Sequence, residues 1–265
     1  VRLSYSEPLQ TWSTNVMGTV NVLEACRDVA SVTTIVVVTS DKCYENHEKK
    51  EGYTESDRLG GHDPYSASKA ATELVVDSYR KSYFDQQNVL IASVRAGNVI
   101  GGGDWSVDRL IPDAVRSVMQ NVSLEVRSPK SSRPWQHVLD SLSGYLLLGQ
   151  KLCEGESHFA QAWNFGPVTG QLATVKDVLD LMQRHWSALN WHLAKQDFQH
   201  ETISLGINSD KARQQLGWES VWDLNKSTEM TALWYKSWLE KGRVDTTSQW
   251  QQYLQDAETM DVCWL

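Results

Sequence analysis

Tyr65 and Lys69 are residues whose types and spacing could do chemistry. A phenol and an ammonium four residues apart lie on one face if the segment is helical. A lysine cation beside a tyrosine favours the phenolate, which brings a proton acceptor toward the neutral pH range. The pair alone is weak evidence, because a solvated helix face explains the same two residues equally well.

A second polar group follows a run of apolar residues. Thr34-Ile-Val-Val-Val-Thr39 has the composition of a fully buried strand, and Ser40, Asp41 and Lys42 come directly after it. Parallel-sheet enzymes gather catalytic groups just past the carboxyl ends of strands, and a hydroxyl, a carboxylate and an amine there could exchange protons. The alternative is a strand-exit turn in which Ser40 and Asp41 only cap backbone groups.

The elements that must position these groups alternate between helix and strand. Apolar spacing predicts helices over 11–30 and 65–83, and buried strands over 34–39 and 88–94. Shorter pieces follow residue 103: helices at 110–120, 138–153, 174–189, 209–216 and 224–241, and strands at 122–126, 162–165 and 201–205. We therefore expect a regular α/β front half, a mixed α/β lobe behind it, and a ligand crevice between them.

The composition disfavours several classes of function. Apolar residues make up 41% of the 265 residues, as in globular proteins that bury a core. Lys and Arg number 25 against 33 Asp and Glu, and the net charge of −8 argues against nucleic acid as a partner. The longest apolar run, 35–38, is far shorter than the ~20 residues of a membrane span.

The four cysteines are widely scattered, at Cys26, Cys43, Cys153 and Cys263. They form no C-x-x-C pair and have no histidine at ligand spacing, so we expect neither a disulfide framework nor a metal site. Unpaired cysteines are usual in a reducing compartment, and the sequence therefore favours a cytoplasmic location.

Longer motifs carry a family resemblance over most of the chain. They are T-S-D-K-C-Y-E-N (39–46), G-G-x-D-P-Y-S-x-S-K (60–69), R-A-G-N-V-I-G-G-G-D-W (95–105), D-R-L-I-P-D (108–113), R-P-W-Q-H-V-L-D (133–140), W-N-F-G-P (163–167) and S-D-K-A-R-x-x-L-G-W (209–218). Together they resemble the CDP-glucose 4,6-dehydratase family of the extended short-chain dehydrogenase/reductase superfamily. The resemblance implies a partial Rossmann-type doubly wound parallel sheet with a smaller mixed α/β substrate lobe.

The same resemblance implies an NAD-dependent lyase. The expected reaction converts CDP-D-glucose to CDP-4-dehydro-6-deoxy-D-glucose and water by C4 oxidation, C5–C6 elimination and hydride return to C6. Tyr65, assisted by Lys69 and the Ser40 hydroxyl, would take the proton of the sugar 4-hydroxyl. NAD is regenerated and so acts as a bound cofactor, with the nucleotide sugar as the small-molecule partner.

Asp41 and Lys42 are the pair that distinguishes this sequence. The related dTDP-glucose dehydratases have Asp-Glu, with Asp as the acid on the leaving 6-hydroxyl and Glu as the base at C5. We expect Asp41 to be that acid and Lys42 to be the base, directly or through a water. A lysine base must be neutral; burial and the positive charges of Lys69 and nicotinamide favour that form, whereas Asp41 opposes it. The alternative is that Lys42 only pairs with the substrate or with Asp41.

The resemblance also assigns binding roles. Asn98 and Arg133 are expected near the diphosphate, and Arg109 near the nucleotide. A guanidinium fork suits a phosphate, although Arg133 could be a plain surface charge. The residues expected on the cofactor side are Tyr65, Lys69, Asn15 and Thr39. Asn15 would support the active site from a central helix, with a solvent-facing amide as the alternative.

The sequence departs from the family at one place. The phosphate-binding fingerprint G-x-x-G-x-x-G does not occur in the 265 residues, and residue 1 is Val. We therefore expect an N-terminally truncated chain that binds NAD poorly when expressed alone. Residues 1–104 would be the C-terminal part of the NAD-binding domain with the catalytic residues. Residues 105–265 would mainly bind the nucleotide sugar, with segments near 135–165 returning to the first domain.

Two other functions remain open at this point. The chain could be another nucleotide-sugar epimerase or dehydratase of the superfamily, or a non-catalytic protein that binds a nucleotide sugar. In addition, the helices predicted over 11–30 and 65–83 resemble the pair through which the family forms dimers. A homodimer is expected on that ground, and apolar residues facing outward would support it.

Overall fold

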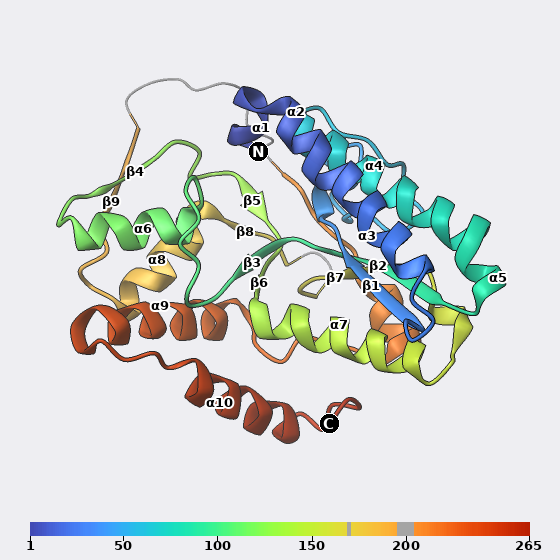
Figure 1. Cartoon of the computed structure of the whole chain (residues 1–265). Coiled ribbons are helices and arrows are strands. Elements are labelled where there is room, and N and C mark those ends of the chain that lie inside the picture. Colours follow the sequence, from blue (N-terminus) through green and yellow to red (C-terminus); the bar gives the residue numbers. More distant parts are fainter. Residues whose placement is uncertain (169–170, 195–203) are drawn as a thin grey trace.

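A three-stranded parallel sheet lies at the centre of the computed structural model, which describes residues 1–168, 171–194 and 204–265 (Figure 1). Its strands are β1 (Thr34–Val38), β2 (Leu90–Ala96) and β7 (Ala162–Phe165), in the order β1-β2-β7. Val38 pairs with Val94 and Ala96 pairs with Phe165, so the three carboxyl ends lie at one edge of the sheet. The polar residues that follow β1 therefore enter the molecule at that edge.

Helices cover both faces of this sheet. Helix α7 (Val138–Cys153) covers one face (Figure 1). The other face carries α1 (Arg2–Ser6), α2 (Pro8–Trp12), the π-helical turn η1 (Ser13–Met17), α3 (Gly18–Arg27), α4 (Pro64–Tyr79), the π-helical turn η3 (Arg80–Phe84) and α5 (Asp85–Gln87). Asp63 caps α4 by accepting a hydrogen bond from Ser66 N at 3.0 Å, and Pro64 occupies the first helical position. This layering confirms the predicted α/β class.

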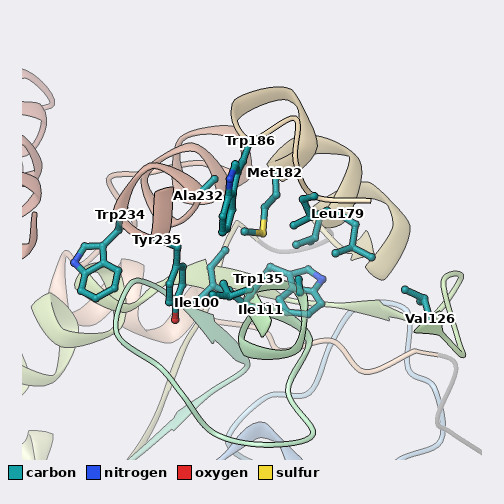
Figure 2. Close-up of a cluster of buried hydrophobic side chains, with 14 residues drawn as sticks. Ile100, Ile111, Val126, Trp135, Leu179, Met182, Trp186, Ala232, Trp234 and Tyr235 are labelled. Carbon is teal, nitrogen blue, oxygen red and sulfur yellow. The ribbon is translucent and has the colours of Figure 1, made fainter. Parts of the chain in front are cut away.

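The remaining elements form a second group around their own core. They are β3 (Asn98–Ile100) paired with β6 (Trp135–His137), β4 (Leu124–Val126) paired with β9 (Trp191–Leu193), β5 (Ser132–Arg133) paired with β8 (Ala173–Thr174), and the helices α6 (Leu110–Met119), α8 (Val175–His185) and α9 (Leu224–Lys241). Figure 2 shows their buried side chains, with Trp135 facing Leu179 and Met182 of α8. Burying such large side chains stabilises this part of the chain by roughly 1.5–3 kcal/mol each.

Most predicted elements are confirmed, with shifts at their ends. The prediction that the strand over 34–39 is fully buried is wrong: β1 lies at the edge of the sheet, none of its residues is buried and Val38 is exposed. The predicted helix over 11–30 belongs to a longer helical run that begins at Pro8, and the helix over 224–241 has the predicted bounds. Of the predicted strand at 201–205, residues 201–203 lie outside the described residues. The 3-10 turn η4 (Ser157–Phe159), the π-helical turn η5 (Ala212–Leu216) and helix α10 (Thr246–Thr259) complete the fold.

Sequence analysis missed helix α10 and the short strands β3, β5, β6, β8 and β9. The apolar face of α10 is sparse, but Tyr253 is buried and its hydroxyl donates to Asp140 Oδ1 at 2.9 Å.

Within the described residues, no helix is both long and apolar enough to cross a membrane.

Two glycines of α7 give a matched test of the packing between this helix and the sheet. A Cβ at Gly144 would lie 2.3 Å from Phe165 Cδ1, whereas the nearest atom to a Cβ at Gly149 is Val36 Cγ2 at 3.8 Å. We expect Gly144→Ala to destabilise the fold by about 1–3 kcal/mol through overpacking. Gly149→Ala should stabilise it by about 0.5–1 kcal/mol through helix propensity.

Urea unfolding followed by circular dichroism measures both changes. Equal effects of the two substitutions would contradict the close approach of α7 to Phe165.

Candidate active site

The turn after β1 gathers three functional groups. Residues Asp41–Cys43 form the 3-10 turn η2, and Ser40 caps it by accepting from Lys42 N at 3.2 Å. Ser40 Oγ also donates to Asp41 Oδ1 at 3.0 Å, and Lys42 Nζ lies 3.3 Å from the same oxygen. Asp41 is fully buried, and its Oδ2 has no hydrogen-bond donor among the described residues. A buried carboxylate oxygen without a donor is costly unless a ligand reaches it.

Tyr65 is the second residue of α4, beside this turn. Burial and the nearby Asp41 carboxylate raise the pKa of the Tyr65 phenol, while Arg109 and a hydrogen bond from Ser40 act to lower it. The net direction is opposite to the expectation based on Lys69 alone. Tyr65, Ser40 and Asp41 are therefore in one electrostatic environment, although they come from two different elements.

Lys69 lies one helical turn after Tyr65, and its Nζ is 6.0 Å from the centroid of the Tyr65 ring. Burial lowers the pKa of Lys69, whereas Glu73 and Cys43 act to raise it. Its Nζ makes no hydrogen bond within the part of the chain that the structure describes. Three ammonium N–H groups are thus available to a ligand at this position.

A buried ionic network lies beneath these residues. The Glu73 carboxylate is contacted by Arg95 Nη2 at 2.7 Å, by Ser93 Oγ at 2.7 Å and by Thr39 Oγ1. Arg95 Nη1 donates in turn to Tyr44 OH at 2.8 Å. Although burial acts to raise the pKa of Glu73, the hydrogen bonds from Arg95, Thr39 and Ser93 hold it below its usual value. The pair is therefore ionised in the core.

Thr39 and Asn15, both assigned to the cofactor side, are engaged within the protein. The Thr39 hydroxyl donates to Glu73 and, at 3.2 Å, to Val94 O. Asn15 lies in η1, where its Nδ2 donates to Ser68 Oγ at 2.9 Å and its carbonyl accepts from Thr72 Oγ1 at 3.0 Å. The Asn15 amide therefore faces α4 rather than solvent, and the π-helical turn is a common feature of functional sites.

The three residues assigned to the substrate lie on separate elements. Asn98 is on β3, and its Oδ1 is buried without a hydrogen-bond donor among the described residues. Arg109 is exposed at the start of α6 and is close enough to Tyr65 to act on its pKa. Arg133 lies on β5, where its Nη1 donates to Ser132 O at 2.7 Å. The structure thus links Arg109 electrostatically to the Tyr65 cluster.

Glu73 and Arg95 were missed by sequence analysis, although a signal for them exists. Arg95 follows the apolar run of a buried strand, where a charge requires a partner of opposite sign. Glu73 follows Lys69 by four residues and so lies on the same face of α4. A search for oppositely charged residues at otherwise buried positions would have paired them.

No group of three or more His, Cys, Asp or Glu side chains that could hold a metal ion occurs in residues 1–168, 171–194 and 204–265.

Comparison with known proteins places this geometry in context. The model of the family described as GDP-mannose 4,6 dehydratase matches residues 1–231. The chain is 46% identical over 245 residues to the CDP-glucose 4,6-dehydratase of Salmonella typhimurium, which covers 90% of this chain and 68% of that protein. It is 28% identical to the low-salt glycan biosynthesis protein Agl12 of Haloferax volcanii, over 84% of this chain and 68% of that protein.

Solved structures share the fold. The dTDP-glucose 4,6-dehydratase of Streptomyces venezuelae, solved with NAD bound, matches with a TM-score of 0.74 at 23% identity, over 91% of this chain and 71% of that chain. A UDP-glucose 4-epimerase of Thermotoga maritima, solved with UDP-glucose, matches with a TM-score of 0.77 at 18% identity, over 90% of this chain and 74% of that chain. These matches confirm the predicted Rossmann-type α/β fold.

Proposed function

Because this chain belongs to the GDP-mannose 4,6-dehydratase family, we propose that it carries the catalytic groups of an NAD-dependent nucleotide-sugar 4,6-dehydratase. The substrate is CDP-D-glucose, in line with the 46% identity to the Salmonella enzyme. The products are CDP-4-dehydro-6-deoxy-D-glucose and water. The observation that carries the proposal is the turn of Ser40, Asp41 and Lys42 beside Tyr65, in which Asp41 is fully buried.

The residues present fit the nicotinamide side of NAD. Lys69 offers an ammonium without a hydrogen-bond acceptor among the described residues, and hydroxyl groups of a ribose would satisfy it. Tyr65 and Lys69 would hold that ribose, and Asn15 would keep α4 in place through Ser68. When bound, NAD supplies reversible hydride transfer, which is chemistry that no side chain can provide.

Tyr65 is the base for the sugar 4-hydroxyl. Its phenolate accepts that proton as C4 becomes a ketone, and the Ser40 hydroxyl, when it turns from Asp41 Oδ1 to the phenolate, donates a hydrogen bond that stabilises the anionic oxygen. The positive charge of Lys69 favours the phenolate when both groups face the bound ligands. Because the product keeps its C4 ketone, this proton then leaves Tyr65 for solvent, which regenerates the phenolate.

Asp41 and Lys42 carry out the elimination. The C4 ketone acidifies C5, and neutral Lys42 takes the C5 proton while Asp41 gives its own proton to the leaving 6-hydroxyl. Neutral Lys42 with protonated Asp41 contains as many protons as the ion pair of the two. The elimination therefore needs no proton from solvent, and it ends as the ion pair that the 3.3 Å contact stabilises. Lys42 then gives its proton back to C5 as the hydride that was removed from C4 is returned to C6, which yields the 6-deoxy product, and Asp41 is reprotonated from solvent.

The substrate is held on the side of β3, β5 and α6. Arg109 and Arg133 supply guanidinium groups for the diphosphate and nucleotide, and the buried Asn98 Oδ1 offers an acceptor that no described residue uses. The net charge of −8 does not oppose an anionic ligand, because placed cations set the local field.

The protein acts as a homodimer in the cytoplasm. Apolar side chains that face outward from the run α1–α3 and from α4 support this assembly; they include Leu3, Leu9, Met17, Val22 and Leu74, of which Leu9 is 85% exposed. Exposed apolar residues gathered on adjacent helices are typical of a subunit interface.

A substrate panel tests the function. The protein that carries this chain is incubated with NAD and CDP-, dTDP-, GDP- or UDP-glucose, and the alkaline absorbance of the 4-keto sugar is measured. We expect kcat/KM to be highest for CDP-glucose, by about tenfold or more, because a site built for one base leaves its polar groups unpaired with another.

Other outcomes separate the alternatives. A change of configuration at C4 without a keto product would indicate an epimerase. Binding of CDP-glucose in calorimetry without any product would indicate a non-catalytic protein.

A further inference from the structure

We propose that Glu73 is a positioning residue of the active site: paired with Arg95, it joins the turn that carries Ser40 and Asp41 to the helix that carries Tyr65 and Lys69. This inference deepens the proposed function and rests on it for the roles of those residues. It gives a positioning role to a buried carboxylate that does not contact the turn of Ser40 and Asp41 directly and does not belong to the motif Tyr65-x-x-x-Lys69.

The hydrogen bonds of Glu73 join α4 to two other parts of the chain, strand β2 and the residue that follows β1. The carboxylate belongs to α4, its Oε2 accepts from Ser93 and Arg95 of β2, and its Oε1 accepts from Thr39. Thr39 directly precedes Ser40, so this bond fixes the residue from which the catalytic turn departs. Glu73, Arg95 and Thr39 are all nearly inaccessible to solvent, where hydrogen bonds to a charged group are worth about 1.5–3 kcal/mol each.

The position of Glu73 on α4 also determines its effect on Lys69. The two residues are four apart and share a helix face, and the Glu73 carboxylate acts to raise the pKa of the Lys69 amine against the effect of burial. The other groups that face Lys69 are the Cys43 thiol of η2 and the Tyr65 ring of α4. Cys43 is buried, and burial raises the pKa of its thiol far above the usual range, so the thiol is neutral and Glu73 is the main charge that opposes the lowering of the Lys69 pKa by burial.

Arg95 completes the arrangement by keeping Glu73 ionised. Its guanidinium lies 5.0 Å from the centroid of the Tyr44 ring and donates to both Tyr44 and Glu73. An unpaired carboxylate at this depth would take up a proton, and its effect on Lys69 would disappear. The negative charge at Glu73 therefore depends on a residue of β2.

The test measures the protonation of Lys69 directly and needs no turnover. The protein is labelled with a trace amount of acetic anhydride across the neutral and alkaline pH range, and acetylation of the Lys69 peptide is followed by mass spectrometry. In Glu73→Gln, we expect the midpoint of Lys69 labelling to move to lower pH by about one unit, a tenfold change in the neutral fraction. An unchanged midpoint would overturn the proposal.

Asp77→Asn is the matched control, because it removes a carboxylate from the same helix one turn further on. Asp77 is half exposed and pairs with Arg80 and Lys81. We expect it to leave the Lys69 midpoint unchanged, and an equal shift in both variants would also contradict a specific role of Glu73.

A double variant covers the case in which Glu73→Gln does not fold, since it leaves Arg95 buried without its partner. Glu73→Gln combined with Arg95→Met removes both charges, and such replacements of buried pairs are often tolerated. The same downward shift of Lys69 is expected in it.

Dehydratase activity tests whether the hydrogen bond from Thr39 to Glu73 positions the turn that carries Ser40 and Asp41. Thr39→Val should lower kcat by about tenfold with little change in KM. Thr39→Ser retains the hydroxyl, so its kcat should stay close to that of the unmodified protein. Ser93→Ala, which also removes one bond to Glu73, should leave kcat within about twofold. If the protein dehydrates no nucleotide sugar, the proposed function is refuted but the role of Glu73 is not. The Lys69 titration still decides the role of Glu73.

Discussion

Tyr65→Phe is expected to lower kcat for dehydration by about 10²–10⁴-fold, the range that a general base contributes. The substitution removes only the phenolic oxygen, so KM for the nucleotide sugar should change little. The product is measured as the 4-keto sugar in the protein that carries this chain. The loss follows from the position of Tyr65, which shares a hydrogen bond with Ser40 and faces Asp41.

The pH dependence of the unmodified protein should have a defined sign. The structure raises the pKa of Tyr65 through burial and Asp41, and a base is active only when deprotonated. The value of kcat/KM should therefore increase as the pH rises through the neutral range. A profile that falls over this range would contradict Tyr65 as the base.

Tyr83→Phe serves as the control for Tyr65→Phe. Tyr83 lies in η3, is partly exposed, and packs against Arg27 and Tyr79 far along the chain from the catalytic turn. We expect its kcat to remain within about twofold of the unmodified value. Retention of more than a tenth of the activity by Tyr65→Phe would exclude an essential proton transfer at this residue.

Lys42→Ala is expected to separate the oxidation at C4 from the elimination. Without the Lys42 amine, the C5 proton has no acceptor, so kcat for the dehydrated product should fall by about 10²–10⁴-fold. Oxidation at C4 depends on Tyr65 and should persist as NADH absorbance in a single turnover. Incorporation of deuterium from solvent at C5, measured by mass spectrometry of recovered sugar, should be lost.

Lys50→Ala provides the control for this experiment. Lys50 is exposed in the loop after the catalytic turn, and its removal changes the charge equally without touching Asp41. Deuterium incorporation at C5 that continues unimpaired in Lys42→Ala would refute Lys42 as the base. Lys42 would then only pair with Asp41, as its 3.3 Å contact also allows.

Local sequence patterns predicted much of the fold. The β-branched run of β1 and the apolar spacing of α4 are decided by residues close in sequence, and both elements occur where expected. Local patterns failed at the ends of elements, at the short strands β3, β5, β6, β8 and β9, and at α10. The polar sequence of α10 conceals that Tyr253 is anchored to Asp140, a residue 113 positions away. Such an anchor leaves no trace in local periodicity.

The sequence by itself determined the chemical inventory: Ser40, Asp41 and Lys42 after a strand, and Tyr65 and Lys69 on one helix face. Only the tertiary structure decided the pKa values of these side chains and the contacts that fix their positions. Burial raises the pKa of Tyr65, and Glu73 meets Thr39 and Arg95 across 34 and 22 residues. Spacing in a sequence specifies which residues share an element, whereas desolvation and the pairing of buried charges depend on which elements come together in space.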